Sequence, residues 1–333
     1  MRFWRSHAPG LLLVGGAVLL ITAGFLVATH LAHHRAAARA QPVTQPTTQA
    51  ATTAEQTTAE QTTAVSTTTA QTTTAAPVTP APVAMSWDDA GGIVWHESAI
   101  DPIWLGQQMR AAGFGWVALY LGEDDDASPP DPSWIARFRA ASGLAVGGWS
   151  VLGVDPAQDA AQAVQLIRED GLAFYIADAE APYGYTEGDS TSATRFGRSR
   201  AFVSAFRAAE PSLPAAVSSY CRPDQHDLDW HAWANGGFAF LPQAYVNELG
   251  AAVSPATCVR AAAAYFPRSR VHPTVASYAG QLGIVGPDSF ARLLARAGTT
   301  GFSIYPAEAG LSMQDWQAYG RAITSLHVAN ALR

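Results

Sequence analysis

The sequence of 333 residues contains no lysine, because all 20 residues counted as Lys or Arg are arginines. This absence excludes Schiff-base and pyridoxal phosphate chemistry and the lysine of a phosphate-binding P-loop. Cysteine is almost as scarce, since only Cys221 and Cys258 occur. Two cysteines allow one intrachain disulfide if the protein folds in an oxidising compartment.

Positive charge is scarce over most of the chain, whose formal net charge is −7. The first 84 residues contain four arginines and two acidic residues. The remaining 16 arginines and 25 acidic residues therefore give the rest of the chain a charge of −9. Because phosphate binding needs a basic face, we expect no nucleic-acid partner.

One long apolar run lies near the start of the chain. Residues 11–29 form 19 positions without a charge, which at about 1.5 Å per residue span most of a ~30 Å hydrocarbon core. We interpret 1–10 as a basic cytoplasmic end and 11–31 as an uncleaved transmembrane signal anchor. A cleaved secretory signal is the alternative, although its nearest site, at 38–40, comes about ten residues too late.

Residues 32–86 consist mainly of Ala, Thr, Gln and Pro and contain almost no large apolar side chains. Such a segment cannot form a core, so we expect a disordered stalk. Together with the anchor, the stalk predicts a single-pass membrane protein whose remaining domain, 87–333, lies outside the cytoplasm. The sequence does not indicate its oligomeric state.

From residue 87 onward, short apolar segments alternate with helical patterns eight times. Several helix starts carry Asp or Ser before Pro, and glycines stand at the expected helix ends. This pattern predicts an α/β fold, a (βα)8 TIM barrel, with an open doubly wound sheet as the alternative. The expected strands begin near Gly92, Gly115, Leu144, Leu172, Pro214, Phe238, Val271 and Gly301.

Two acidic residues follow the apolar run at 172–177. Residues i and i+2 of a strand point to the same side, so Asp178 and Glu180 share one face at the carboxyl end of that strand. One interpretation is a buried carboxylate paired with an arginine. The other is acid–base chemistry, because two adjacent carboxylates push one pKa upward and the protonated acid can donate to a glycosidic oxygen.

Catalytic and binding residues of a barrel lie at the carboxyl ends of its strands. Those ends are rich in aromatic, acidic and amide side chains, which suit a sugar ring through stacking and hydrogen bonds. The candidates are His96, Glu97, Tyr120, Trp149, Gln243, Tyr245, Asn247, Tyr305 and Glu308, beside Asp178 and Glu180.

We expect no metal and no cofactor. A zinc hydrolase on this fold would need more histidines than His96 at its strand ends. The acidic run at 123–126 is more simply a solvated loop than a calcium site. Glycines at 280, 283 and 286 indicate a flexible loop. Cys221 and Cys258 follow adjacent expected strands on the same side of the barrel, and we predict a disulfide between them.

The D-x-E at Asp178 and Glu180 resembles the motif of retaining glycoside hydrolase barrels, families 18 and 25. Ile176 replaces the middle aspartate of the family 18 motif. The segment 240–247, FLPQAYVN, is similar to the Q-x-Y-N of plant-type family 18 enzymes and to uncharacterised bacterial glycoside-hydrolase-like barrels. Tyr305 stands near the place where such sites usually carry tryptophan.

The resemblance implies that Glu180 is the general acid, with Asp178 as its helper, and that Gln243 and Tyr245 hold the sugar. We therefore expect a membrane-anchored glycoside hydrolase acting on an N-acetylated or cell-wall glycan, either a polysaccharide or peptidoglycan. The alternative is a non-catalytic barrel that binds glycan on a stalk.

Overall fold

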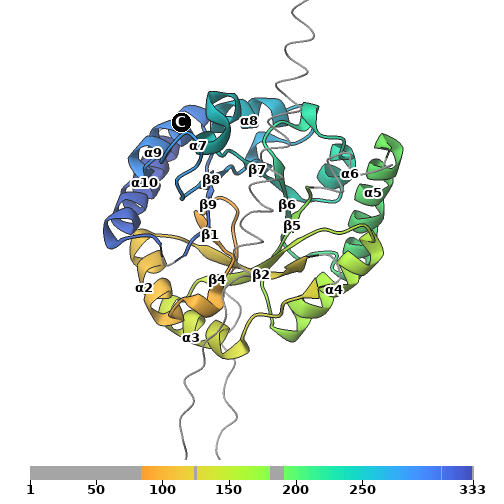
Figure 1. Ribbon diagram of the computed structural model, residues 1–333, viewed down its shortest axis with the longest axis horizontal. Helices are drawn as coiled ribbons and strands as arrows, with labels where there is room; N and C mark the ends of the chain where they lie inside the picture. Colours follow the sequence, from red (N-terminus) through yellow and green to blue (C-terminus); the bar gives the residue numbers. More distant parts are fainter. Residues whose placement is uncertain (1–83, 124–125, 181–190, 309, 332–333) are drawn as a thin grey trace, which may run out of the picture. The chain divides into compact units, whose positions relative to one another are not determined.

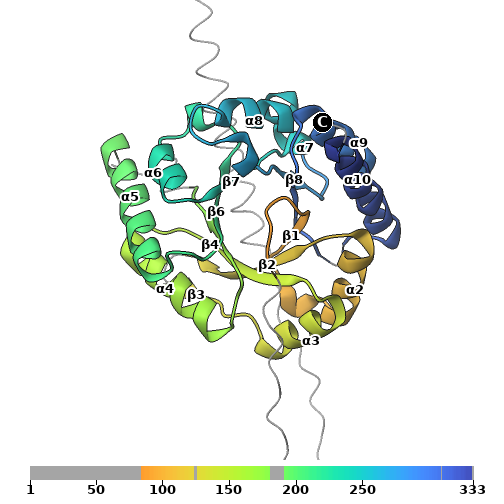
Figure 2. The ribbon, with the colours of Figure 1, turned by 180° about the vertical axis from the view of Figure 1, so that it is seen from behind.

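A computed structural model of the chain describes residues 84–123, 126–180, 191–308 and 310–331 (Figure 1). Eight parallel strands form a closed barrel inside a ring of helices, which is visible from both sides (Figures 1 and 2). Closure is direct, because the first strand pairs with both the second and the last. The predicted barrel is confirmed, and the open sheet is wrong. The parallel strands are β1 (Gly91–Val94), β2 (Trp116–Glu123), β4 (Ala145–Val151), β5 (Tyr175–Asp178), β6 (Ala215–Tyr220), β7 (Ala239–Gln243), β8 (Thr274–Ala276) and β9 (Ser303–Tyr305).

Each of the eight parallel strands begins within three residues of its predicted start. The sequence did not predict β3 (Asp126–Ala127), a two-residue strand that pairs antiparallel with the end of β2. Because β3 pairs with the last residues of β2, it lies beyond the closed ring and leaves the parallel barrel unchanged.

Five of the described α-helices begin at a proline that follows Asp, Ser or Gly, as predicted. The carboxylates of Asp101, Asp131 and Asp155 accept hydrogen bonds from the first free amides of their helices. The α-helices are α2 (Pro102–Ala112), α3 (Pro132–Ser142), α4 (Pro156–Glu169), α5 (Ser192–Ala209), α6 (Trp230–Asn235), α7 (Val246–Leu249), α8 (Pro255–Ala262), α9 (Pro287–Ala297) and α10 (Met313–Ala331). Short 3-10 helices are η1 (Glu97–Ala99), η2 (Pro223–Gln225), η3 (Gly250–Val253) and η4 (Arg268–Arg270).

The barrel interior is filled by large rings at the amino ends of the strands. Trp116 and Phe174 meet edge to face at 5.2 Å, and Trp87 packs against both from the segment before β1. Gly91 makes room for this layer, because a Cβ there would lie 2.0 Å from the Trp116 ring. The interior is therefore closed at this end, and the opposite end carries the polar side chains.

Among the described residues, no helix is both long and apolar enough to span a membrane. The predicted anchor at 11–31 and most of the predicted stalk lie outside the described residues, so both remain predictions.

Candidate functional site

The acidic pair lies at the carboxyl end of β5. Asp178 is the last residue of this strand and is half-buried, while Glu180 follows two residues later with 8% of its surface exposed. Strand alternation turns Ile176 into the barrel interior beneath them, where it is 1% exposed and belongs to the same apolar cluster as Trp149. The carboxylates therefore stand on an apolar floor.

Gln243, the last residue of β7, joins the two carboxylates. Its Nε2 donates hydrogen bonds to Glu180 Oε1 at 2.6 Å and to Asp178 Oδ1 at 3.2 Å, and lies 3.4 Å from Ser218 Oγ. The two carboxylate oxygens can therefore be no farther apart than 5.8 Å, the sum of 2.6 Å and 3.2 Å. The side chain is 6% exposed, so these bonds are shielded from water.

An aromatic cluster adjoins the carboxylates. The Trp95 ring lies 5.5 Å from Tyr120, 5.7 Å from Trp149 and 6.2 Å from Tyr305. Tyr305 in turn stacks on Tyr245 at 6.2 Å. Trp149 is buried, and its indole N–H donates to Val94 O at 2.8 Å. These rings offer the flat apolar surfaces that bind the C–H face of a sugar.

Tyr245 and Tyr305 keep their protons over the physiological pH range. Burial raises the pKa of Tyr245 well above its ordinary value, and the neighbouring phenols and the charges of Asp178 and Glu180 raise it further. Burial also raises the pKa of Tyr305 well above its ordinary value, followed by the charges of Asp178, Glu308 and Glu180. Both hydroxyls can therefore donate hydrogen bonds to a sugar.

Glu308, His96 and Glu97 meet where β1 and β9 close the ring. Glu308 Oε1 accepts hydrogen bonds from the main-chain amides of Trp95 at 2.8 Å and His96 at 2.9 Å. The exposed His96 ring lies with Nδ1 3.6 Å from the same oxygen. Glu97 opens η1, and burial raises its pKa, as do the charges of Asp131 and Glu308.

Asn247 lies in a helix, so its expected place at the carboxyl end of a strand is wrong. β7 ends at Gln243, and Asn247 is buried in α7. Its side-chain Nδ2 donates to Tyr278 O at 2.6 Å, and its main-chain carbonyl oxygen accepts from Leu282 N at 2.8 Å. Asn247 therefore fixes the loop that follows β8.

The glycine loop after β8 is ordered by its own hydrogen bonds. Gly280 and Gly283 exchange main-chain bonds of 3.0 and 2.9 Å, and Glu248 Oε2 accepts from Gln281 N at 3.1 Å. Within the described part of the chain, no group of three or more His, Cys, Asp or Glu residues is placed to hold a metal. Two residues of the acidic run, 124 and 125, lie outside that part.

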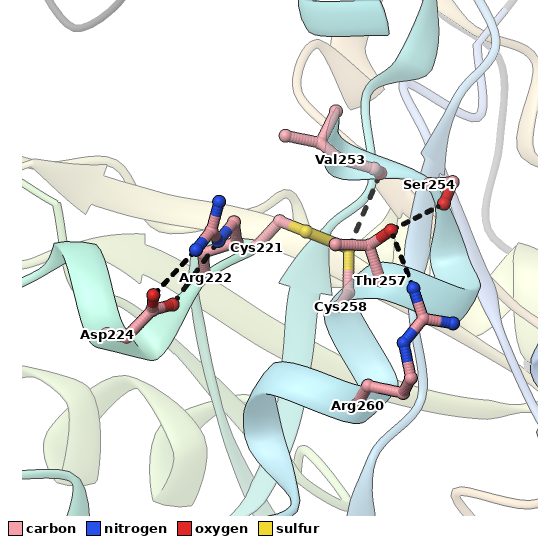
Figure 3. Close-up of a disulfide and its surroundings, with 8 residues drawn as sticks. All are labelled: Cys221, Arg222, Asp224, Val253, Ser254, Thr257, Cys258 and Arg260. Atoms are coloured by element: carbon pink, nitrogen blue, oxygen red, sulfur yellow. Dashed lines mark hydrogen bonds and ion pairs between the residues drawn. A yellow bond between two sulfur atoms is a disulfide. The ribbon is translucent and has the colours of Figure 1, made fainter. Parts of the chain in front are cut away.

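Cys221 and Cys258 form a disulfide, as the sequence predicted, with their Cα atoms 4.9 Å apart (Figure 3). Cys221 follows β6, Cys258 lies in the first half of α8, and both are buried. Beside the bridge, Arg222 pairs with Asp224 at 2.7 Å. The disulfide thus ties the end of β6 to α8.

Trp95 is the main site residue that the list of candidates missed. It lies at the centre of the aromatic cluster, next to the candidates His96 and Glu97. The signal was present, because Ile93 points into the barrel and alternation turns Trp95 to the same side.

No protein-family model matches the sequence, and no curated protein matches it. Solved structures share the barrel at low identity. The galactosidase domain of an α-galactosidase–sucrose kinase, AgaSK, matches with a TM-score of 0.51 and 12% identity, over 73% of this chain and 41% of that one. A GH18 chitinase from Pseudoalteromonas aurantia matches with a TM-score of 0.49 and 12% identity, over 72% and 99% of the two chains. A chitinase domain from Pyrococcus furiosus gives 0.48 and 11%, over 73% and 95%. The comparison with the AgaSK domain therefore shows the barrel fold alone.

Proposed function

We propose that the barrel is a glycoside hydrolase acting on an N-acetylated or cell-wall glycan, with Glu180 as general acid and Asp178 as its helper. One observation carries this proposal: a single amide, that of Gln243, holds both carboxylates at the carboxyl ends of the strands. The aromatic cluster beside them supports a sugar as the ligand, and the fold shared with chitinases and a galactosidase is compatible with it.

The separation of the two carboxylates argues against an inverting pair. Their bridged oxygens are at most 5.8 Å apart, below the roughly 6.5–9.5 Å that separates the carboxyl groups of inverting enzymes. Glu180 gives its proton to the glycosidic oxygen as the bond to the anomeric carbon breaks. Asp178 stabilises the positive charge that develops on the sugar or orients its acetamido group. Water then attacks the anomeric carbon and returns a proton to Glu180.

The test is turnover of chitin and peptidoglycan fragments by the full chain, measured as released reducing ends. Glu180→Gln keeps the shape of the side chain but cannot supply the proton, so kcat should fall by about 10²–10⁴-fold. Glu169→Gln, an exposed carboxylate at the end of α4, is the matched control and should retain activity. Equal activity in Glu180→Gln and the wild type would refute the proposal.

We also propose that the barrel is held outside the cytoplasm by residues 11–31 and the stalk at 32–86, rather than released by signal cleavage. The charge-free run at 11–29 and the disulfide support export and retention in the membrane. Recovery of the intact chain in the soluble culture fraction of its host would contradict this placement.

A non-catalytic glycan-binding barrel is the second candidate, and Ile176 favours it. The family 18 motif that this chain resembles has a carboxylate at this position, whereas Ile176 lies in the apolar interior. Glycan binding that survives Glu180→Gln, together with no cleavage of either polymer, would favour this candidate.

A further inference from the structure

The carboxylate of Glu308 connects the two ends of the barrel sheet. Its Oε1 accepts the amides of Trp95 and His96, although Glu308 lies 213 and 212 residues away along the chain. A main-chain hydrogen bond crosses the same seam, from Ala307 N to Ile93 O at 2.8 Å. A charged oxygen that receives two consecutive main-chain amides fixes the direction of the chain at that point.

These amides belong to the residues that place the Trp95 indole. Trp95 is half-buried, and its ring lies within 6.2 Å of the rings of Tyr120, Trp149 and Tyr305. Trp149 is buried, and its indole N–H is bonded to a main-chain carbonyl, so it forms the base of the cluster. Of the two indoles in the cluster, Trp95 is the one that retains accessible surface.

We infer that Trp95 is the sugar-binding platform of the site and that Glu308 is its positioning residue. Glu308 acts through the main chain of Trp95 and His96, and its bridging oxygen is occupied by that task rather than by a sugar hydroxyl. The inference rests on the proposed function for the nature of the ligand. It changes the role expected for Glu308 from substrate contact to support.

Binding of the N-acetylglucosamine tetramer to the full-length protein, measured by calorimetry, tests this division of roles. Trp95→Ala and Glu308→Ala should each weaken binding at least tenfold. The double variant should bind no more weakly than Trp95→Ala alone, because Glu308 acts only through Trp95. Glu308→Gln keeps an acceptor oxygen for both amides and should bind within about threefold of the wild type.

Asp155→Ala is the matched control. One oxygen of Asp155 also accepts two main-chain amides, Ala157 N at 3.0 Å and Gln158 N at 3.2 Å, at the start of α4. Loss of the Asp155 carboxylate should leave tetramer binding unchanged. In the free protein, hydrogen exchange at the Trp95 and His96 amides should accelerate at least tenfold in Glu308→Ala and remain unchanged in Asp155→Ala.

Several outcomes would overturn the inference. These are wild-type affinity in Trp95→Ala or Glu308→Ala, additive losses in the double variant, unchanged exchange at the two amides, or no binding of the tetramer by the wild type. Failure of the proposed hydrolase is distinguishable. If the predicted binding pattern is found but Glu180→Gln cleaves glycan as well as the wild type, the inference stands and the assignment of the acid falls.

Discussion

Replacing Gln243 with leucine tests whether its amide holds the acidic pair together. The substitution keeps a side chain of similar volume but removes the donors to Glu180 and Asp178. Hydrogen bonds to charged groups contribute about 1.5–3 kcal/mol each. Because one nitrogen serves both carboxylates and Glu180 is nearly buried, we expect the free energy of unfolding at pH 7 to fall by about 2–4 kcal/mol. For a domain of this size that corresponds to a fall in Tm of roughly 5–15 °C.

Urea denaturation at pH 7 measures the effect. The control is Gln165→Leu, since Gln165 Nε2 also donates to a carboxylate, that of Glu169, at 2.9 Å, but on the exposed surface of α4. Gln165→Leu should lower the free energy of unfolding by no more than about 0.5 kcal/mol. An equal loss in the two variants, or none in Gln243→Leu, would refute the argument.

Two further predictions concern stability. Cys258→Ser opens a loop of 37 residues and should lower the free energy of unfolding by about 4 kcal/mol, as should reduction of the wild type in denaturant; an unchanged urea midpoint would contradict this. Burial lowers the pKa of His226 to about 3 and that of His272 to about 4. As the pH falls, the unfolded chain therefore takes up these protons before the folded chain does. The free energy of unfolding is not reduced by these histidines above about pH 6.5, and between there and about pH 4 each histidine should lower it by ~1.4 kcal/mol per pH unit. His226→Phe should make this pH dependence shallower in thermal unfolding, and an unaltered slope would show that His226 is not responsible.

Local patterns were enough to predict the barrel and its acidic pair. Alternation along the strands fixed which side Asp178, Glu180 and Gln243 face, and parallel pairing of β5, β6 and β7 then brings their carboxyl ends together. The starts of α2, α3 and α4 followed from side-chain capping, which depends on residues only two or three positions apart.

No local pattern in the sequence indicated that Asn247 would lie in a helix. α7 begins after Tyr245, which makes no side-chain capping bond, and the alternation of polar and apolar residues continues through 247. The chain nevertheless turns, because Val246 N bonds to Ala244 O. The role of Glu308 was equally hidden, since it depends on how the loop after β9 meets β1, more than 200 residues away.

Ile176 determines how the acidic pair has to be supported. In a site with another carboxylate deeper in the barrel, the lower residue of the pair could share a proton or a hydrogen bond with it. Here the position beneath Asp178 is apolar and offers no such partner. Gln243 supports the pair from the end of β7, and Ser218 lies within 3.4 Å of the same amide nitrogen. If the pair is catalytic, β7 therefore controls its geometry. Changes at Gln243 should then alter both stability and glycan turnover, whereas in a barrel that only binds glycan they should alter stability and binding without any turnover to lose.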